Sequence, residues 1–114
     1  MTTPWTEDHM PDQTGRVAIV TGSNSGIGWE AARALANKGA TVIMACRSIA
    51  KANLAADQIK ALKPSGKVVG MALDLGDLAS VRAFAAAFRQ DYDRLDLLIN
   101  NGGVAKPPYG KTAQ

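Results

Sequence analysis

One glycine-rich stretch constrains the fold of this chain more than any other part of it. It reads Thr21-Gly22-Ser23-Asn24-Ser25-Gly26-Ile27-Gly28. An apolar run over residues 17–20 precedes it, and a helical pattern follows it over residues 29–38. A glycine-rich turn between a strand and a helix can bind phosphate, because the first amides of the helix lack internal partners and carry partial positive charge. The stretch therefore predicts a site for the diphosphate of a dinucleotide.

The three glycines of this motif have separate roles in the prediction. Gly22 can adopt a tight turn that a side chain resists, Gly26 lets the backbone approach a diphosphate, and Gly28 lets the helix lie close to the sheet. The short polar side chains between them are expected around the same phosphate oxygens: Ser23, Asn24 and Ser25. On the glycines alone, an ordinary turn between a strand and a helix remains the alternative.

Strand and helix patterns alternate along the rest of the chain. Apolar runs predict strands over residues 16–21, 41–46, 67–73 and 95–100, and helical periods predict helices over residues 26–38, 49–63 and 78–91. Strands separated by helices pair in parallel through right-handed crossovers. We therefore expect an α/β fold, a Rossmann-like doubly wound parallel sheet (βαβαβαβ) of strand order 3-2-1-4, with its cleft between the first and fourth strands.

Each predicted helix has an apolar face that should pack on the sheet. The expected inner residues are Ile27, Ala31, Ala34 and Leu35 in the first helix, Ala52, Ala55, Ala56, Ile59 and Leu62 in the second, and Leu78, Val81, Phe84, Ala85 and Phe88 in the third. The fourth strand is apolar on both faces and would leave an uncovered sheet edge. Such an edge predicts self-association, or a partner chain that pairs with the fourth strand.

The composition favours one globular domain with two irregular ends. The chain has 114 residues, of which 46% are hydrophobic, enough for a modest core. We expect a flexible arm over residues 1–14, a nucleotide-binding Rossmann half-domain over residues 15–103 and an extended tail over residues 104–114. The net charge of +3 is scattered along the chain, which favours a solvated surface over a nucleic-acid-binding patch.

The distribution of apolar residues and cysteine suggests a cytoplasmic protein. No apolar run approaches the roughly 20 residues that span a bilayer, and residues 1–14 lack the apolar core of a secretory signal. Cys46 is the only cysteine, so no internal disulfide can form. The single histidine, His9, has no neighbours at metal-ligand spacing, so no metal site is expected.

Arg47 follows the second predicted strand, at the position that distinguishes NAD from NADP in dinucleotide-binding folds. A carboxylate there holds the ribose 2′-hydroxyl of NAD, whereas a guanidinium can bind the 2′-phosphate of NADP bidentately. Such a charge-assisted hydrogen bond contributes on the order of 1.5–3 kcal/mol. The sequence therefore favours NADP over NAD, with a plain surface arginine as the alternative. Ser48 can support the same phosphate, cap the following helix, or do both.

Three motifs in this order resemble the short-chain dehydrogenase/reductase family. The T-G-x-x-x-G-I-G pattern of that family matches from Thr21 to Gly28, and an Asp after the third strand appears as Asp74-Leu75. Its Asn-Asn-Ala-Gly motif appears as Asn100-Asn101-Gly102-Gly103, with glycine in place of alanine. The segments over residues 42–48 and 107–112 look most like the retinol-dehydrogenase-like subgroup.

The resemblance implies cofactor contacts for residues that position alone leaves open. Asp74 would accept a hydrogen bond from the adenine amino group, and the backbone of Leu75 would meet the ring. From position alone, Asp74 is equally well a turn residue before Gly76, with Asp77 capping the next helix. The floor beneath the adenosine ribose would be formed by Asn101, Gly102 and Gly103.

The family's catalytic serine and its Tyr-x-x-x-Lys motif have no counterpart in this chain. Tyr92 is followed four residues later by Asp96, and Tyr109 by Ala113. The resemblance covers residues 16–112, the N-terminal half of the family pattern, so it implies a truncated NADP(H)-binding portion with no catalytic residue. The complete form would be an oxidoreductase acting on a small-molecule alcohol or carbonyl compound. The alternative is a non-catalytic nucleotide-binding module, or a truncated fragment that depends on a partner.

Overall fold

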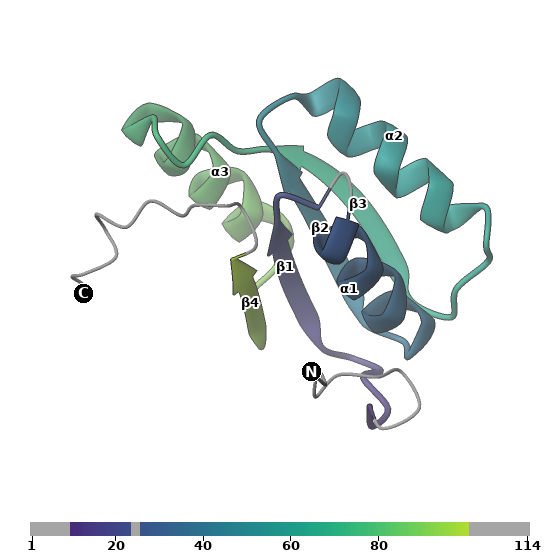
Figure 1. Cartoon of the computed structure of the whole chain (residues 1–114). Helices are drawn as coiled ribbons and strands as arrows, with labels where there is room; N and C mark the ends of the chain where they lie inside the picture. The colour runs from purple at the N-terminus through teal and green to yellow at the C-terminus, as the bar shows by residue number, and fades with distance from the viewer. Residues whose placement is uncertain (1–9, 24–25, 101–114) are drawn as a thin grey trace, which may run out of the picture.

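The computed structural model describes residues 10–23 and 26–100. Strands and helices alternate there, and their bounds are β1 (Val17–Thr21), α1 (Gly26–Asn37), β2 (Thr41–Cys46), α2 (Ile49–Lys60), β3 (Lys67–Ala72), α3 (Leu78–Asp91) and β4 (Leu97–Asn100). The strands form one parallel sheet in the order β3-β2-β1-β4 (Figure 1). The predicted order of elements and the predicted strand order are both confirmed.

Helices cover both faces of the sheet (Figure 1). On one face, α1 and α2 pack through Leu35 and Ile59 against Val20, Val42 and Met44. On the other face, α3 packs through Phe88 against a second apolar cluster of strand residues: Val17, Ile19, Ile43 and Ala45. Because successive strand residues point to opposite faces, the continuous apolar runs of β1 and β2 supply both clusters. The doubly wound α/β fold is therefore confirmed.

Three residues that were expected on inner helix faces are exposed instead. The exposed fractions are 77% for Ile27, 57% for Leu62 and 63% for Leu78. Ile27 and Leu78 lie in the first turns of α1 and α3, and Leu62 lies beyond the end of α2 at Lys60. The prediction was wrong for these three because a helical period, read from sequence, does not show where the helix passes beyond the sheet that it covers.

The second helix ends three residues earlier than predicted. Its bounds are Ile49–Lys60, and Lys63 has a φ of +56°, in the left-handed region that ends a helix. Pro64 follows Lys63, and a residue before proline is disfavoured in the right-handed helical region.

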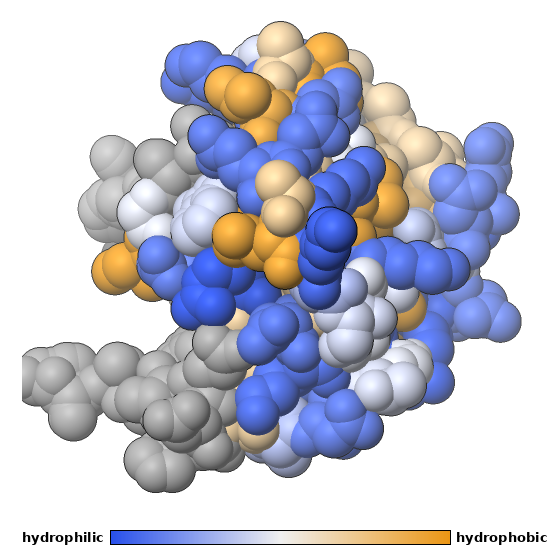
Figure 2. All heavy atoms as spheres, turned by 90° about the vertical axis from the view of Figure 1, so that its right-hand side faces the viewer, coloured by the Kyte–Doolittle hydropathy of each residue, from blue (hydrophilic) through white to orange (hydrophobic). Residues whose placement is uncertain are grey.

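The surface that carries α2 shows apolar side chains interspersed with hydrophilic ones (Figure 2).

Residues 10–14, the described part of the predicted N-terminal arm, pack against the body. Gln13 is only 7% exposed, and its backbone N–H donates to the carbonyl of Lys38 at 2.8 Å. Gly39 has a φ of +102°, and a Cβ there would lie 2.5 Å from Thr14 Oγ1. Only glycine fits this crossing of the chain over the end of α1. Residues 1–9 and 101–114, which include the predicted tail, lie outside the described residues.

Candidate functional site

The carboxyl ends of the four parallel strands lie along one edge of the sheet, where open α/β sheets bind their ligands (Figure 1). Gly22 follows β1, Arg47 follows β2 and Asp74 lies two residues beyond β3. Asn100 ends β4 beside Thr21 of β1 in the sheet register. The topology therefore brings the three predicted motifs to one edge, although they are far apart in sequence.

Two glycines of the turn have a left-handed backbone conformation, and that of Gly22 agrees with the tight turn expected there. Gly22 has a φ of +62° and Gly26 a φ of +64°, both in the left-handed region that favours glycine. A Cβ at Gly26 would meet no protein atom within 4 Å, so within the protein itself it is the backbone conformation that favours glycine there. Gly28 is buried in the first turn of α1. Asn24 and Ser25 lie outside the described residues.

Ser23 lies in the turn with its side chain packed inward. It is 0% exposed, and its Oγ lies 3.7 Å from Sγ of Cys46, the last residue of β2. The preceding amide, of Gly22, donates to the carbonyl of Ala45 at 2.9 Å. The turn is therefore attached to β2 through two consecutive residues. The Ser23 hydroxyl is turned toward β2, whereas the sequence led us to expect it around the phosphate oxygens.

Arg47 and Ser48 occupy the connection from β2 to α2. Arg47 is exposed, and within residues 10–23 and 26–100 no hydrogen bond or ion pair engages its guanidinium. Ser48 is the N-cap of α2, and its Oγ accepts from the backbone N–H of Lys51 at 3.3 Å. Of the two roles that were left open for Ser48, the structure shows the capping role.

Asp74 forms a tight turn at the carboxyl end of β3. Its Oδ1 accepts from the amide of Gly76 at 2.9 Å, and its own amide donates to Ser80 Oγ at 2.9 Å. Asp77 caps α3 by accepting from Ala79 N–H at 3.0 Å. The turn interpretation of Asp74 is thus confirmed, and it leaves the second carboxylate oxygen for other contacts. Leu75 beside it is 47% exposed.

A hydrogen bond joins the strands that border the expected cleft. Thr21 Oγ1 donates to Oδ1 of Asn100 at 2.8 Å, from the last residue of β1 to the last residue of β4. Sequence reasoning did not pair these two side chains. The signal was present, because both residues end strands that were predicted to be neighbours. The other residues of the motif, Asn101, Gly102 and Gly103, lie outside the described residues.

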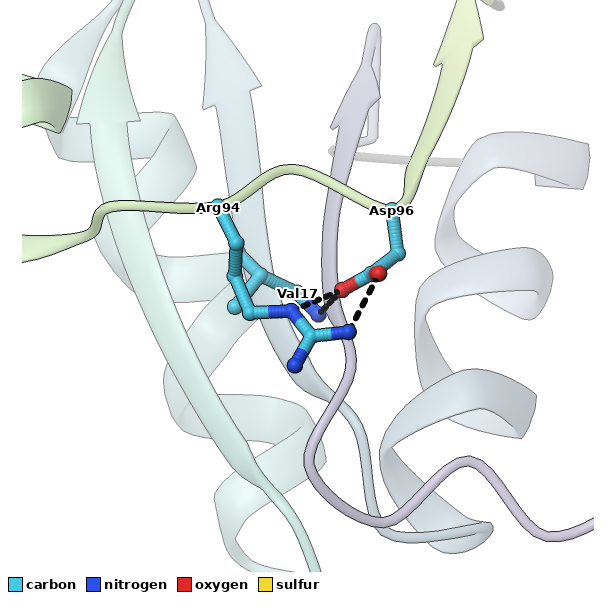
Figure 3. Close-up of polar contacts among 3 residues, drawn as sticks. All are labelled: Val17, Arg94 and Asp96. Atoms are coloured by element: carbon cyan, nitrogen blue, oxygen red, sulfur yellow. Dashed lines mark hydrogen bonds and ion pairs between the residues drawn. The ribbon is translucent and has the colours of Figure 1, made fainter.

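At the opposite ends of the same two strands, Asp96 just before β4 binds both Arg94 and the backbone of Val17 in β1 (Figure 3). Arg94 Nε donates to Asp96 Oδ2 at 2.8 Å and its Nη2 donates to Oδ1 at 2.6 Å. The amide of Val17 also donates to Oδ2, at 2.8 Å (Figure 3). The hydrogen bond from Arg94, with that from Val17, lowers the pKa of Asp96. This contact fixes β4 on β1 at the edge of the sheet remote from the candidate site.

Tyr92 lies at the C-cap of α3, near this remote edge. Burial, with a contribution from the nearby Asp91 carboxylate, raises the pKa of its phenol above the ordinary value. A tyrosine that transfers protons near neutral pH requires a shift in the other direction. Position and pKa therefore both set Tyr92 apart from the candidate site.

The part of the chain that the structure describes offers neither a metal centre nor a membrane-spanning helix. Among residues 10–23 and 26–100, no three His, Cys, Asp or Glu side chains gather closely enough to hold a metal ion. No helix in those ranges is both long enough and apolar enough to cross a bilayer.

Known proteins share this fold and much of this sequence. A family model described as short chain dehydrogenase matches residues 16–113. Retinol dehydrogenase 11 of Mus musculus is 52% identical over 99 residues, which cover 87% of this chain and 31% of that protein. The chain thus spans about a third of the length of the curated relatives that it matches.

Two solved structures resemble the fold closely. Menthone neomenthol reductase from Mentha piperita aligns with a TM-score of 0.73 and 40% identity, over 78% of this chain and 32% of that one. The Pseudomonas aeruginosa RhlG/NADP active-site complex aligns with a TM-score of 0.73 and 33% identity, over 83% of this chain and 38% of that one.

Proposed function

Because this chain belongs to the short chain dehydrogenase family, we propose that it binds NADP(H) at the carboxyl edge of its sheet. It forms the cofactor-binding portion of an oxidoreductase whose complete form acts on an alcohol or carbonyl compound. The glycine turn carries this proposal. Of its two left-handed glycines, Gly22 follows β1 and Gly26 begins α1, where free amides and the helix dipole favour a diphosphate.

Arg47 supports NADP(H) over NAD(H) as the cofactor. Its guanidinium is exposed at the carboxyl edge of the sheet and has no ion-pair partner among the described residues, so it is available to a 2′-phosphate. Asp74 supports an adenine contact beside it, because its Oδ1 is used in the turn while the second carboxylate oxygen remains for a ligand. A relative of this chain has been solved as an NADP complex, which agrees with this assignment.

The bound cofactor would supply the hydride of the reaction, and the residues of this chain would bind and orient it. The family's Tyr-x-x-x-Lys spacing is absent from the 114 residues. No proton donor is therefore assigned here, and we expect the 114-residue chain by itself to show no NADPH-dependent carbonyl reduction.

An exposed sheet edge supports the alternative, a nucleotide-binding module that depends on a partner. β4 pairs with β1 on one side and ends the sheet on the other. The exposed fractions of its leucines are 40% for Leu97 and 59% for Leu98, and Leu95 just before the strand is 45% exposed. A strand supplied by another polypeptide would bury these side chains and satisfy the open backbone groups of β4.

Calorimetric titration of the 114-residue chain with NADPH and NADH tests the proposed site. We expect saturable NADPH binding that Arg47→Asp weakens about ten- to a hundredfold, the range of a charge-assisted hydrogen bond. Arg89→Asp makes the same charge change near the far end of α3 and serves as the matched control. Tighter binding of NADH than of NADPH would remove the role of Arg47, and absence of both would overturn the proposed site.

A further inference from the structure

Three segments of the proposed cofactor site meet at one buried residue, Cys46. Its backbone carbonyl accepts from the amide of Leu73 at 2.7 Å, which places the residue before Asp74. Its Sγ lies 3.7 Å from Ser23 Oγ in the glycine turn. The next residue along the chain is Arg47. Cys46 therefore connects the diphosphate turn, the candidate 2′-phosphate ligand and the adenine-side turn.

The side-chain contact between Ser23 and Cys46 is enclosed by the protein. Ser23 is 0% exposed and Cys46 is 5% exposed. A buried hydroxyl needs a partner, and the thiol can act as a weak donor or acceptor toward it. The nearby bond from Gly22 N–H to the Ala45 carbonyl involves backbone only and does not depend on residue type. Of the two contacts between the glycine turn and β2, only the one between Ser23 Oγ and Cys46 Sγ can therefore be removed by substituting a side chain.

We propose that Ser23 and Cys46 are a positioning pair, whose contact sets the position of the glycine turn relative to Arg47. This inference rests on the proposed NADP(H) site. The diphosphate and the 2′-phosphate of NADPH are separated by a fixed chain of bonds, so both must meet their protein partners at once. A shift of the turn relative to Arg47 therefore weakens NADPH binding more than NADH binding, because NADH lacks the 2′-phosphate. Neither side chain needs to touch the cofactor.

Titrations of Ser23→Ala, Cys46→Ala and the double variant with NADPH and NADH test this pair. We expect Ser23→Ala to raise the Kd for NADPH about three- to tenfold, the range of one hydrogen bond, and the Kd for NADH less than about twofold. The double variant should lose little more than either single variant, because both remove one contact. Ser65→Ala is the matched control, since it removes a hydrogen bond to the Asn37 carbonyl at the opposite edge of the sheet. Equal losses for the two cofactors, or an unchanged Kd for NADPH, would overturn the positioning role.

A second measurement tests the contact without any cofactor. Cys46 carries the only thiol of the chain and is buried. Under native conditions, Ser23→Ala should raise the rate of iodoacetamide alkylation at least about threefold over wild type and Ser65→Ala, after correction for differences in global unfolding. Equal alkylation rates in the three proteins would show that the Ser23 side chain does not protect the Cys46 thiol, and would overturn the proposed contact. Failure of wild type to bind either cofactor would overturn the proposed function, and alkylation would then decide the contact by itself.

Discussion

Asp96 and Val17 hold each other by two hydrogen bonds. The Val17 amide donates to Asp96 Oδ2 at 2.8 Å, and the Asp96 amide donates to the Val17 carbonyl at 2.9 Å. Arg94 binds both oxygens of the same carboxylate. A slip of β4 by one residue would break this contact and turn every side chain of the strand to the other face. Asp96 therefore fixes the register of the edge strand on β1.

The Asp96 contact predicts a loss of stability in acid. The Arg94 and Val17 hydrogen bonds lower the pKa of Asp96 in the folded state, so its contribution is fully present above the unfolded value of about 3.9. The contribution disappears as pH falls through the lower folded pKa. We expect the free energy of unfolding, measured by urea between pH 2 and pH 6, to fall more steeply below pH 4 in wild type than in Asp96→Asn. Asp57→Asn, at an exposed ion pair 4.0 Å long, is the control. Parallel curves for wild type and Asp96→Asn would contradict this role.

The Thr21–Asn100 hydrogen bond predicts a measurable cost for an isosteric change. Thr21→Val removes the hydroxyl that donates to Asn100 Oδ1, while water can still reach the exposed asparagine. We expect the free energy of unfolding to fall by about 1 kcal/mol, the net value of one hydrogen bond. Thr41→Val makes the same change at the start of β2, where the described residues offer the Thr41 hydroxyl no hydrogen bond, and should have little effect. Equal effects of the two variants would show that the Thr21 hydroxyl contributes nothing specific.

The conformation of Gly26 predicts strain for any side chain there. A Cβ at this position meets open space, so Gly26→Ala isolates the cost of a φ of +64°. We expect the free energy of unfolding to fall by about 1–2 kcal/mol, with weaker NADPH binding as the turn relaxes. Gly76→Ala is the control, because Gly76 has no positive φ. A Cβ added there would lie 3.4 Å from its nearest neighbour, Asp74 Oδ1, which is an ordinary contact. If Gly26→Ala and Gly76→Ala lower the free energy of unfolding equally, the turn does not require the left-handed conformation at Gly26.

The uncovered edge at β4 predicts self-association of the 114-residue chain. Light scattering over a range of concentrations should show a mass above that of the monomer, and Leu98→Lys should return it toward the monomer by placing charge on the edge. Leu54→Lys on α2 is a close control, since Leu54 is 60% exposed and Leu98 is 59% exposed. A monomeric wild type at all concentrations, or an equal effect of both variants, would exclude pairing through β4.

Local chemistry determined the order of elements, the strand order and the conformation of the glycine turn. Apolar runs identified β1 and β2 as strands, and the glycines identified the turn before α1, because these signals depend on residues close in sequence. Parallel strands joined by helices then allow few arrangements, so the meeting of Gly22, Arg47 and Asp74 at one edge also followed from sequence.

Only the tertiary structure decided which side chains meet across segments. The inward packing of Ser23 onto Cys46, the Thr21–Asn100 bond and the attachment of Asp96 to Val17 join residues 23 to 79 positions apart. The exposure of Ile27 likewise depends on tertiary structure, namely on where α1 lies on the sheet. Such contacts depend on strand register and on where each helix crosses the sheet. Periodicity within one segment carries no information about either, because both are set by packing between segments that are distant in the chain.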